Sequence, residues 1–561
     1  MTIIIDGQTL GLEAIRAVAL GEEVALTDSA AVRDRVRRSQ AVVEDKLERG
    51  EQVYGVTTLF GAMADQYVTT EQLVDLQRLA IWQHKSTTGP RLPTPDVRAA
   101  MLLRANSLIK GASGIRLEVI ERFVTFLNSG AHPHVYQRGS IGASGDLVPL
   151  SYIAGAVVGL DPAFLVDMGE ETLDSHTALS RLGLEPVALR PKEGLALNNG
   201  TGASTGVAAN ALSRFLELTS VALEVHALYA QALGATDQSF ASFIHEMKPH
   251  PGQVWTAEQM RRLLDGSRLI RSEKSGDRSH RGGGLIQDRY GIRCLPQYIG
   301  PIVDALAVAT TQITTEANCA NDNPLIDPDS GEILHTGNFL AQYTGVAMDS
   351  VRFQMGMLAK HLDSQIALLM TPEFSNGLSP SLVANTGGGI EPADASGGAE
   401  SGLNVGFKSL GINGNQMMPL LSFYGQSVID RYPTHAEQYN QNINSQSMNA
   451  ANLARDALEV LEHYLAVALM IGIQAVELRA KLVADTYDAR EVLSAGTVDL
   501  NTAARSAAAG PPAADRPLQW NDMDAFSQPM VEGLLRELPR NGSVMSSVRR
   551  TVSALSAFAG A

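Results

Sequence analysis

The chain has 561 residues, enough to bury a large core and to form two or three structural regions. Lys and Arg number 44 against 60 Asp and Glu, and the resulting net charge of -16 disfavours non-specific binding to nucleic acid or to an anionic membrane. The two cysteines, Cys294 and Cys319, form no Cys-x-x-Cys motif, which excludes a disulfide framework and a zinc ribbon.

The N-terminus, Met-Thr-Ile-Ile-Ile-Asp, lacks the basic segment of a signal peptide. The longest apolar run, near 464–473, is much shorter than the roughly 20 residues of a membrane-spanning helix. We therefore expect a soluble, cytoplasmic protein that acts on a small molecule, with no nucleic-acid, membrane or metal partner.

The N-terminal region reads as mixed structure. A short strand is expected at 3–5, followed by amphipathic helices with charged faces such as 33–38. A loop at 54–65 leads into a helix over about 70–84, which ends at a cluster of Gly and Pro. No internal repeat is visible.

Helical periodicity becomes strong further along the chain. Apolar residues recur at three- and four-residue steps within 207–229, 351–369 and 453–475. Helices of about 25 to 30 residues would be roughly 40 Å long, which predicts a mainly α fold with a long central helical bundle. The expected regions are an N-terminal domain at 1–198, the bundle at 199–480 and a C-terminal helical tail at 481–561, entered through a linker at 506–512.

Gly-rich connections lie between the predicted helices, at 199–206, 276–284 and 387–402. The segment 276–284 directly precedes Tyr290 and Arg293, so it is either an active-site lid or a flexible surface loop. The segment 387–402, with three glycines followed by acidic and small residues, is interpreted as a solvated excursion.

The most informative stretch is 139–150, Gly-Ser-Ile-Gly-Ala-Ser-Gly-Asp-Leu-Val-Pro-Leu. Its spacing fits neither a dinucleotide-binding Gly-x-Gly-x-x-Gly nor a hydrolase Gly-x-Ser-x-Gly. Attack of the Gly145 nitrogen on the Ala143 carbonyl carbon, with loss of water from the ring and from the Ser144 side chain, would give 4-methylideneimidazole-5-one (MIO). By itself, Ala-Ser-Gly is more commonly a turn that caps a helix.

Residues 139–152 resemble the signature of the aromatic amino acid ammonia-lyase family, which includes histidine, phenylalanine and tyrosine ammonia-lyases and aminomutases. The likeness runs from about 54 to 522 and is closest to bacterial and cyanobacterial phenylalanine ammonia-lyases. Supporting stretches are Lys-Glu-Gly-Leu-Ala at 192–196, Asp-Arg-Tyr-Gly-Ile-Arg-Cys at 288–294, Asp-Asn-Pro at 322–324, Gly-Asn-Phe at 337–339 and His-Ala-Glu-Gln-Tyr-Asn-Gln at 435–441. The resemblance implies that the N-terminal region carries the MIO loop and that no external cofactor is needed.

An ammonia-lyase must remove a weakly acidic β-hydrogen and expel a poor leaving group. The resemblance implies that Ala143, Ser144 and Gly145 form the electrophile, that Tyr54 is the base and that Arg293 binds the substrate carboxylate. Matches to the family's other site residues are Asn323 at the carboxylate, Tyr290 and Gln287 as supports, Asn199 near the ring carbonyl, Phe339 against the ring, Leu195 in the pocket, and Glu437 and Gln441 near the amine. Taken singly, these residues are ordinary loop, turn, ion-pair or core positions.

Several of these residues precede predicted helices. Asn199 lies before a helix from near Ala203, Arg293 before one after Pro301, and Gln441 before one from about Asn449. Helix N-termini carry positive partial charge, so their convergence would activate the ring and favour a Tyr54 phenolate.

Two positions bear on the substrate. Gln441 stands where histidine ammonia-lyases carry Glu, which disfavours histidine. Gln83-His84 aligns with a selectivity pair that is Phe-Leu in many phenylalanine-specific members and His or Ser-His in some tyrosine-specific ones. A buried donor pair left unpaired by a phenyl ring would cost about 1 to 3 kcal/mol, which favours tyrosine. The alternative is that His84 caps its helix.

Leu59 replaces a glycine common in the family, where its side chain either narrows the expected pocket or alters the Tyr54 loop, and Gly202-Ala203 replace bulkier residues. We expect an ammonia-lyase that converts L-tyrosine, L-phenylalanine or both to trans-coumarate or cinnamate. The alternatives are a 2,3-aminomutase, which returns the amine to Cβ, a histidine ammonia-lyase, and an inactive helical scaffold. Because relatives combine residues from three subunits in one site, a homotetramer with shared active sites is expected.

Overall fold

The computed structural model describes residues 2–272, 287–384 and 405–509, with a few positions beyond 509. The segments 276–284 and 387–402, interpreted above as a lid or loop and as a solvated excursion, lie outside the described residues. The chain forms two compact units. The first unit comprises Met1–Ser213, Ala309–Val351 and Gln426–Asp456, and the second comprises Arg214–Val308, Arg352–Gly425 and Ala457–Ala561.

Each unit is assembled from segments that are distant in sequence. Helices α9 (Gly202–Ala232), α13 (Leu295–Ala317), α14 (Gln342–Met370) and α16 (Ser447–Ala484) contribute residues to both. The expected domain boundaries after 198 and 480 do not coincide with the limits of these units, and as a division into domains they stay a prediction.

The first unit is built from shorter helices. They are α1 (Leu12–Ala19), α2 (Ala30–Glu48), α3 (Leu73–Trp82), α4 (Thr94–Leu108), α5 (Leu117–Ser129), α6 (Leu147–Val158), α7 (Ser175–Arg181) and α8 (Glu193–Asn198), with 3₁₀ turns at Gly61–Met63 and Thr70–Gln72. Helix α4 packs against α1 and α5 and is buried almost all round, including the charged residues Asp96, Arg98 and Arg104. Such buried charges need internal partners, which makes α4 a polar core helix.

Three small sheets accompany these helices. Strand β1 (Ile3–Ile5), expected from the sequence, pairs in parallel with β2 (Val24–Leu26). Strands β3 (Ala131–Pro133), β4 (Leu165–Met168) and β5 (Glu171–Asp174) form an antiparallel meander, and β6 (Leu325–Asp327) pairs with β7 (Glu332–Leu334) as a hairpin.

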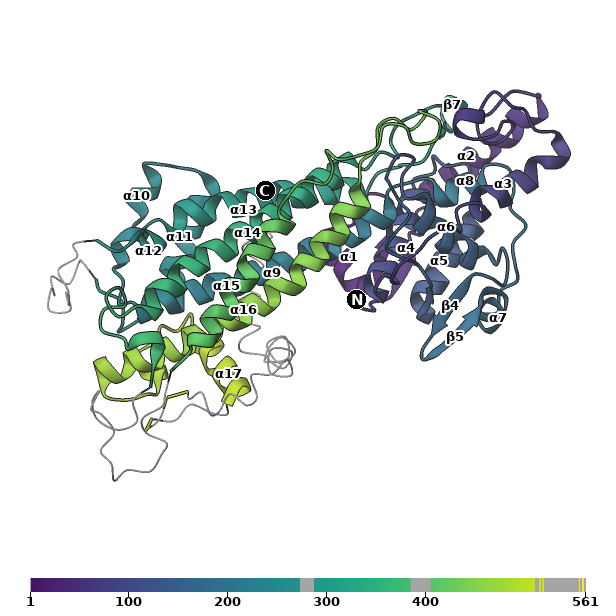
Figure 1. The fold of residues 1–561 in the computed structure, drawn as a ribbon. Helices are drawn as coiled ribbons and strands as arrows, with labels where there is room; N and C mark the ends of the chain where they lie inside the picture. Colours follow the sequence, from purple (N-terminus) through teal and green to yellow (C-terminus); the bar gives the residue numbers. More distant parts are fainter. Residues whose placement is uncertain are drawn as a thin grey trace. The chain divides into compact units, whose positions relative to one another are not determined.

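The second unit contains the predicted helical bundle, in which α9, α13, α14, α15 (Lys408–Tyr424) and α16 run side by side (Figure 1). The Tyr229 hydroxyl on α9 donates to the Ala468 carbonyl on α16 at 2.6 Å, and His226 Nδ1 bonds Gln365 Oε1 on α14 at 2.7 Å. The three periodic segments fall within α9, α14 and α16, which confirms the mainly α fold class.

The other elements described in the second unit are α10 (Ser242–Glu246), α11 (Pro251–Leu264), α12 (Tyr290–Arg293) and α17 (Val498–Ala509), with 3₁₀ turns at Asp237–Phe240, Pro380–Leu382 and Ala489–Glu491. Within the described ranges, no helix is both long enough and apolar enough to cross a membrane.

Two expected helix limits are wrong. Pro301 lies inside α13, which begins at Leu295, because Leu295, Ile299 and Ile302 bury a continuous face that outweighs the lost hydrogen bond. The linker expected from 506 is helical up to 509 as the end of α17, an alanine-rich run of high helix propensity.

Candidate active site

The turn before α6 has a backbone that glycine alone accommodates. Gly142 and Gly145 have φ values of +68° and +71°. A Cβ on Gly145 would lie 2.2 Å from the Gly200 carbonyl oxygen, and one on Gly142 would lie 2.1 Å from Ser445 Oγ. The turn is thus pressed against two other segments, and its glycines are required both by conformation and by space.

A buried polar network holds this turn. Asp146 is fully buried and accepts hydrogen bonds from Ser204 N at 2.7 Å, Ser204 Oγ at 2.8 Å and Ser140 Oγ at 3.0 Å. Burial raises the pKa of Asp146, and these donors oppose the rise. Ser447 Oγ donates to Ser204 Oγ at 3.1 Å, and Ser445 Oγ donates to the carbonyl of Gly142 at 3.1 Å.

This network brings the N-terminal ends of α9 and α16 together, as the helix-end hypothesis expects. The N-terminal end of α9 faces the Asp146 carboxylate. The negative charge of this carboxylate offsets part of the positive potential of the helix end. The start of α13 at Leu295 belongs to the second unit, so its share in the convergence stays a prediction.

Ser144 receives two side-chain amides. Asn199 Nδ2 donates to the Ser144 carbonyl oxygen at 2.7 Å, and Gln441 Nε2 donates to Ser144 Oγ at 3.0 Å. In a ring closed between Gly145 and Ala143, the carbonyl of Ser144 becomes the ring carbonyl. The residues around the turn therefore fit MIO, and Asn199 donates to the carbonyl that would become the ring carbonyl.

These groups face a cavity of about 580 Å³ in the first unit. Among its lining residues are the predicted Tyr54, Leu59, Gln83, His84, Ala143, Ser144, Leu195, Asn199, Asn323, Phe339, Glu437 and Gln441. Sequence reasoning missed Phe60, Leu147, Asn198, Leu340 and Asn440, which also line it. Each of them is next to a predicted residue in the sequence or lies within a stretch that matches the family. That position was the signal by which the sequence could have indicated them.

Tyr54 lies at this cavity on the loop after α2. Its hydroxyl oxygen accepts a hydrogen bond from Gly61 N at 2.9 Å. Burial raises the pKa of Tyr54, and the carboxylate of Glu437 raises it further, while the Gly61 bond opposes both. The groups of the first unit therefore raise the pKa of Tyr54, whereas a base that works near neutrality is expected to have a lowered pKa.

Glu437 closes the same side of the cavity. Its carboxylate accepts from Ala62 N at 3.1 and 3.2 Å, which ties it to the loop that carries Tyr54. Glu437, Gln438 and Tyr439 have φ values of +49°, +55° and +65°, a left-handed run that is strained for residues with a Cβ. Strained backbone of this kind clusters at functional sites.

His84 and Gln83 differ from the buried donor pair that was expected. Gln83 is exposed, and His84 Nδ1 lies 2.8 Å from the Ala80 carbonyl oxygen. Burial lowers the pKa of His84 and so favours the neutral ring. Because a carbonyl can only accept, Nδ1 carries the proton and Nε2 is left as an acceptor. His84 therefore caps α3, as the alternative proposed, and also presents an acceptor instead of a donor.

Tyr290, Arg293 and Gln287 belong to the second unit and are not among the residues that line this cavity. The Arg293 guanidinium carbon lies 4.5 Å from the centre of the Tyr290 ring and the group donates to Gln287 Oε1. Tyr290 is 70% exposed. The three residues form a cluster of their own around α12, and their contact with substrate stays a prediction.

The profile of the family described as aromatic amino acid lyase matches residues 10–499. The chain is 60% identical to an aromatic ammonia-lyase from Loktanella atrilutea over all of both chains. It is 50% identical to a phenylalanine ammonia-lyase from Nostoc punctiforme, over 97% of this chain and 93% of that protein. The crystal structure of tyrosine aminomutase from Streptomyces globisporus superposes with a TM-score of 0.81 at 28% identity, over 96% and 99% of the two chains.

The fold and the site thus define a carbon–nitrogen lyase. The chain belongs to the aromatic amino acid lyase family.

Proposed function

We propose that this protein eliminates ammonia from L-tyrosine, L-phenylalanine or both, and gives trans-coumarate or cinnamate, with MIO formed from Ala143, Ser144 and Gly145. The observation that carries the proposal is that Ser144, with an amide donor on its carbonyl and another on its hydroxyl, faces the cavity that Tyr54 also lines. The names of the two close relatives support it.

When formed, the ring would supply an electrophilic methylene for the substrate's amine. Asn199 would act on this group through the carbonyl of Ser144, which in the ring is conjugated with the former Cβ of that residue. Its N–H, 2.7 Å from the carbonyl oxygen, would draw electron density toward oxygen and leave the carbon more electrophilic. Gln441, whose side-chain amide donates to Ser144 Oγ, would contact the amine.

Tyr54 takes the β-proton on its phenolic oxygen. The electron pair of the broken C–H bond forms the Cα–Cβ double bond, and the electron pair of the Cα–N bond goes to nitrogen. Transfer of the proton from Tyr54 to the departing nitrogen releases ammonia and restores the phenolate. The Gly61 N–H orients this oxygen and stabilises its phenolate form. Burial and Glu437 oppose ionisation, so Tyr54 needs either alkaline pH or a cation from outside the first unit.

A homotetramer with shared sites would supply that cation. The resemblance implies sites that combine residues from three subunits, and in such an assembly Arg293 and Tyr290 would complete the site of another subunit. Large apolar side chains are exposed on α14, where Tyr343 is 66% exposed and Val346 is 42% exposed. Such residues are typical of surfaces that bury each other in oligomers, which supports assembly.

The choice of aromatic ring rests on His84 and Gln441. A phenolic hydroxyl can donate to His84 Nε2, which favours tyrosine, whereas the relative from Nostoc punctiforme, which is named a phenylalanine ammonia-lyase, supports phenylalanine. Gln441 offers no fixed negative charge to an imidazolium, which disfavours histidine. A 2,3-aminomutase is the second candidate, because solved tyrosine aminomutases share the fold.

The test is incubation of the purified protein with tyrosine, phenylalanine and histidine separately, with Ser144→Ala as the control. Release of ammonia with coumarate or cinnamate supports the proposal, and a β-amino acid as the main product supports the aminomutase. No product from any of the three, or equal activity of Ser144→Ala, contradicts both. The intact mass should be lower than that of the plain chain by two water molecules.

A further inference from the structure

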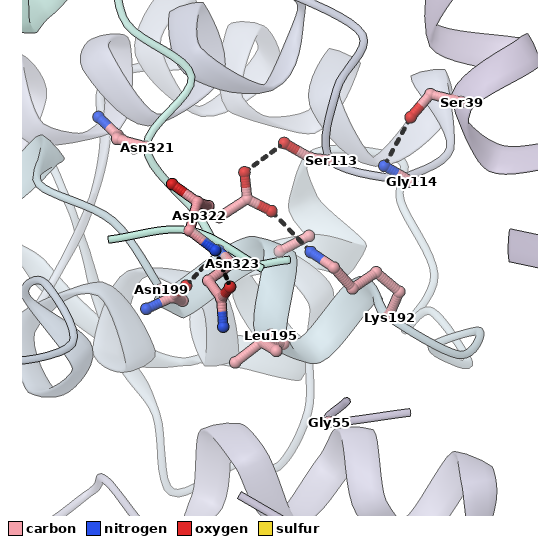
Figure 2. A network of polar contacts seen from close by, with 12 residues as sticks. Ser39, Gly55, Ser113, Gly114, Lys192, Leu195, Asn199, Asn321, Asp322 and Asn323 are labelled. Carbon is pink, nitrogen blue, oxygen red and sulfur yellow. Dashed lines mark hydrogen bonds and ion pairs between the residues drawn. The ribbon is translucent and has the colours of Figure 1, made fainter. Parts of the chain in front are cut away.

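A buried ion pair in the first unit joins Lys192 and Asp322. Lys192 Nζ lies 2.6 Å from Asp322 Oδ2, and neither side chain is exposed to solvent. Ser113 Oγ donates to the other carboxylate oxygen at 2.8 Å, and Figure 2 shows the three side chains directed at one another. Desolvation makes such a pair a weak contributor to stability, but its fixed geometry can hold two segments in place.

The pair holds one end of the short helix α8. Lys192 directly precedes α8 and has a φ of +77°, a conformation that a lysine rarely adopts. Asn199 directly follows the same helix. Asn323, the residue after Asp322, donates its backbone N–H to Asn199 Oδ1 at 2.6 Å (Figure 2). Consecutive residues of one loop segment thus hold the two ends of α8.

Arg104 adds a third link from the buried helix α4. Its Nη1 donates to the Asn199 carbonyl at 3.1 Å and to Asn321 Oδ1 at 3.0 Å, and its Nη2 donates to the Ala196 carbonyl at 2.5 Å. Arg104 is fully buried. The segment 321–323 is therefore connected to α8 at its beginning, at its middle and at its end.

These links determine which way the amide of Asn199 points. Its oxygen is taken by the Asn323 N–H, so its nitrogen must face the Ser144 carbonyl, where it donates at 2.7 Å. We propose that Lys192 and Asp322 are positioning residues that set the electrophilicity of the ring by holding the segment 321–323, and through it the Asn199 amide, on the Ser144 carbonyl. This inference rests on the proposed function, because it needs MIO.

The first test removes both charges together, so that no unpaired charge is left buried. The double variant Lys192→Met/Asp322→Asn keeps the size of both side chains and the acceptor for Ser113. Its matched control is Arg505→Met/Glu477→Gln in the second unit, which removes another ion pair, 2.8 Å long and nearly as buried. Melting temperatures of both variants show whether each folds.

The readout is the reactivity of the methylene without any substrate. Borohydride reduces it by adding one hydride, and water adds one proton, so the intact mass rises by two hydrogens. We expect the reduction rate and kcat to fall about tenfold or more in Lys192→Met/Asp322→Asn, since an active-site displacement of about 1 Å can cost about a hundredfold. KM should change little, and the Arg505→Met/Glu477→Gln control should keep the unaltered rate. Equal rates in the two double variants overturn the proposal.

The second test asks whether the pair acts through Asn199. Asn199→Ala alone should slow the reduction, and adding Lys192→Met/Asp322→Asn to it should cause little further loss, because both remove the same interaction. Full additivity overturns the proposal. If the double variant does not fold, Ser113→Ala, which removes one donor to Asp322, should still slow the reduction a few-fold, and an unchanged rate counts against the proposal.

The outcomes separate this inference from the proposed function. Reduction rates that follow the expected order, in a protein that releases no ammonia from tyrosine or phenylalanine, reject the substrate assignment and leave the positioning role supported. An unaltered chain that has not lost two water molecules overturns both.

Discussion

Tyr54 has a raised pKa, whereas the proposed reaction needs its phenolate form. Because only the deprotonated form accepts the β-proton, a raised pKa means that the active fraction is small near neutrality and grows as pH rises. We expect kcat/KM to increase about tenfold per pH unit on the acidic side of the profile. In Glu437→Gln this rise should move to lower pH, because the carboxylate of Glu437 contributes to the raised pKa.

The measurement is the pH dependence of kcat/KM for both proteins. Asp75→Asn is a suitable control, since Asp75 lines a neighbouring cavity but not the one that Tyr54 lines. The Asp75→Asn profile should match that of the unaltered protein. A Glu437→Gln profile that coincides with it, or that moves to higher pH, contradicts the electrostatic account.

His84 offers a prediction about selectivity. With Nδ1–H held by Ala80, its Nε2 can accept from the hydroxyl of tyrosine but gains nothing from phenylalanine. His84→Leu should lower the ratio of kcat/KM for tyrosine over phenylalanine about tenfold or more, because it removes the acceptor. The neighbouring Gln83→Leu, exposed at the same cavity, should leave the ratio within about threefold. A similar change in both variants would show that His84 acts only as a cap.

The limits of sequence reasoning are visible in these residues. Tyr54 and Ser144 stand in recognisable motifs, and the structure places both at one cavity. The proton position on His84 depends on the distance to a carbonyl four residues earlier, which no motif encodes. Lys192 and Asp322 are 130 positions apart, so their pairing, and its effect on Asn199, needed coordinates.

At the scale of elements, the long helices were the most predictable part of the fold. The apolar spacing in 207–229 and 453–475 predicted long helices correctly, because a long packed helix buries a continuous apolar stripe along its length, as α9 and α16 do. Pro301 misled the prediction, because proline often opens a helix and here lies within one. The turn around Gly145 could be named from the sequence, but its contact with Gly200 could not.

The turn that is proposed to form the ring yields a prediction of its own. Gly145→Ala should prevent most of the ring closure and lower the melting temperature, since its Cβ would strain a φ of +71° and meet the Gly200 carbonyl. Gly130→Ala is the matched control, with a similar φ of +69° and open space around the added Cβ. It should cost only about 1 kcal/mol of stability and keep the ring. Intact mass reports ring closure, and loss of both water molecules in Gly145→Ala would contradict the prediction.

At the scale of the whole molecule, the residues matched to the family fall into different units. Ser144 and Tyr54 lie in the first unit, and Arg293 lies in the second. The proposed homotetramer would bring Arg293 of one subunit to the Ser144 of another. If sites are shared in this way, mixing two kinds of inactive subunit should restore some activity. A site built within a single chain would not regain activity on mixing.

Ser144→Ala and Arg293→Ala should each be almost inactive alone. When the two chains are co-expressed, a site that takes Ser144 from one variant and Arg293 from the other is intact, so random mixing should restore about a quarter of the sites. Activity of tagged and purified mixed oligomers, compared with each variant alone, measures this. The double variant Ser144→Ala/Arg293→Ala co-expressed with Ser144→Ala is the control and should stay inactive, because no chain in it supplies Ser144. Recovery in the first mixture supports shared sites, whereas its absence from oligomers shown to contain both chains would place Ser144 and Arg293 in the same subunit's site.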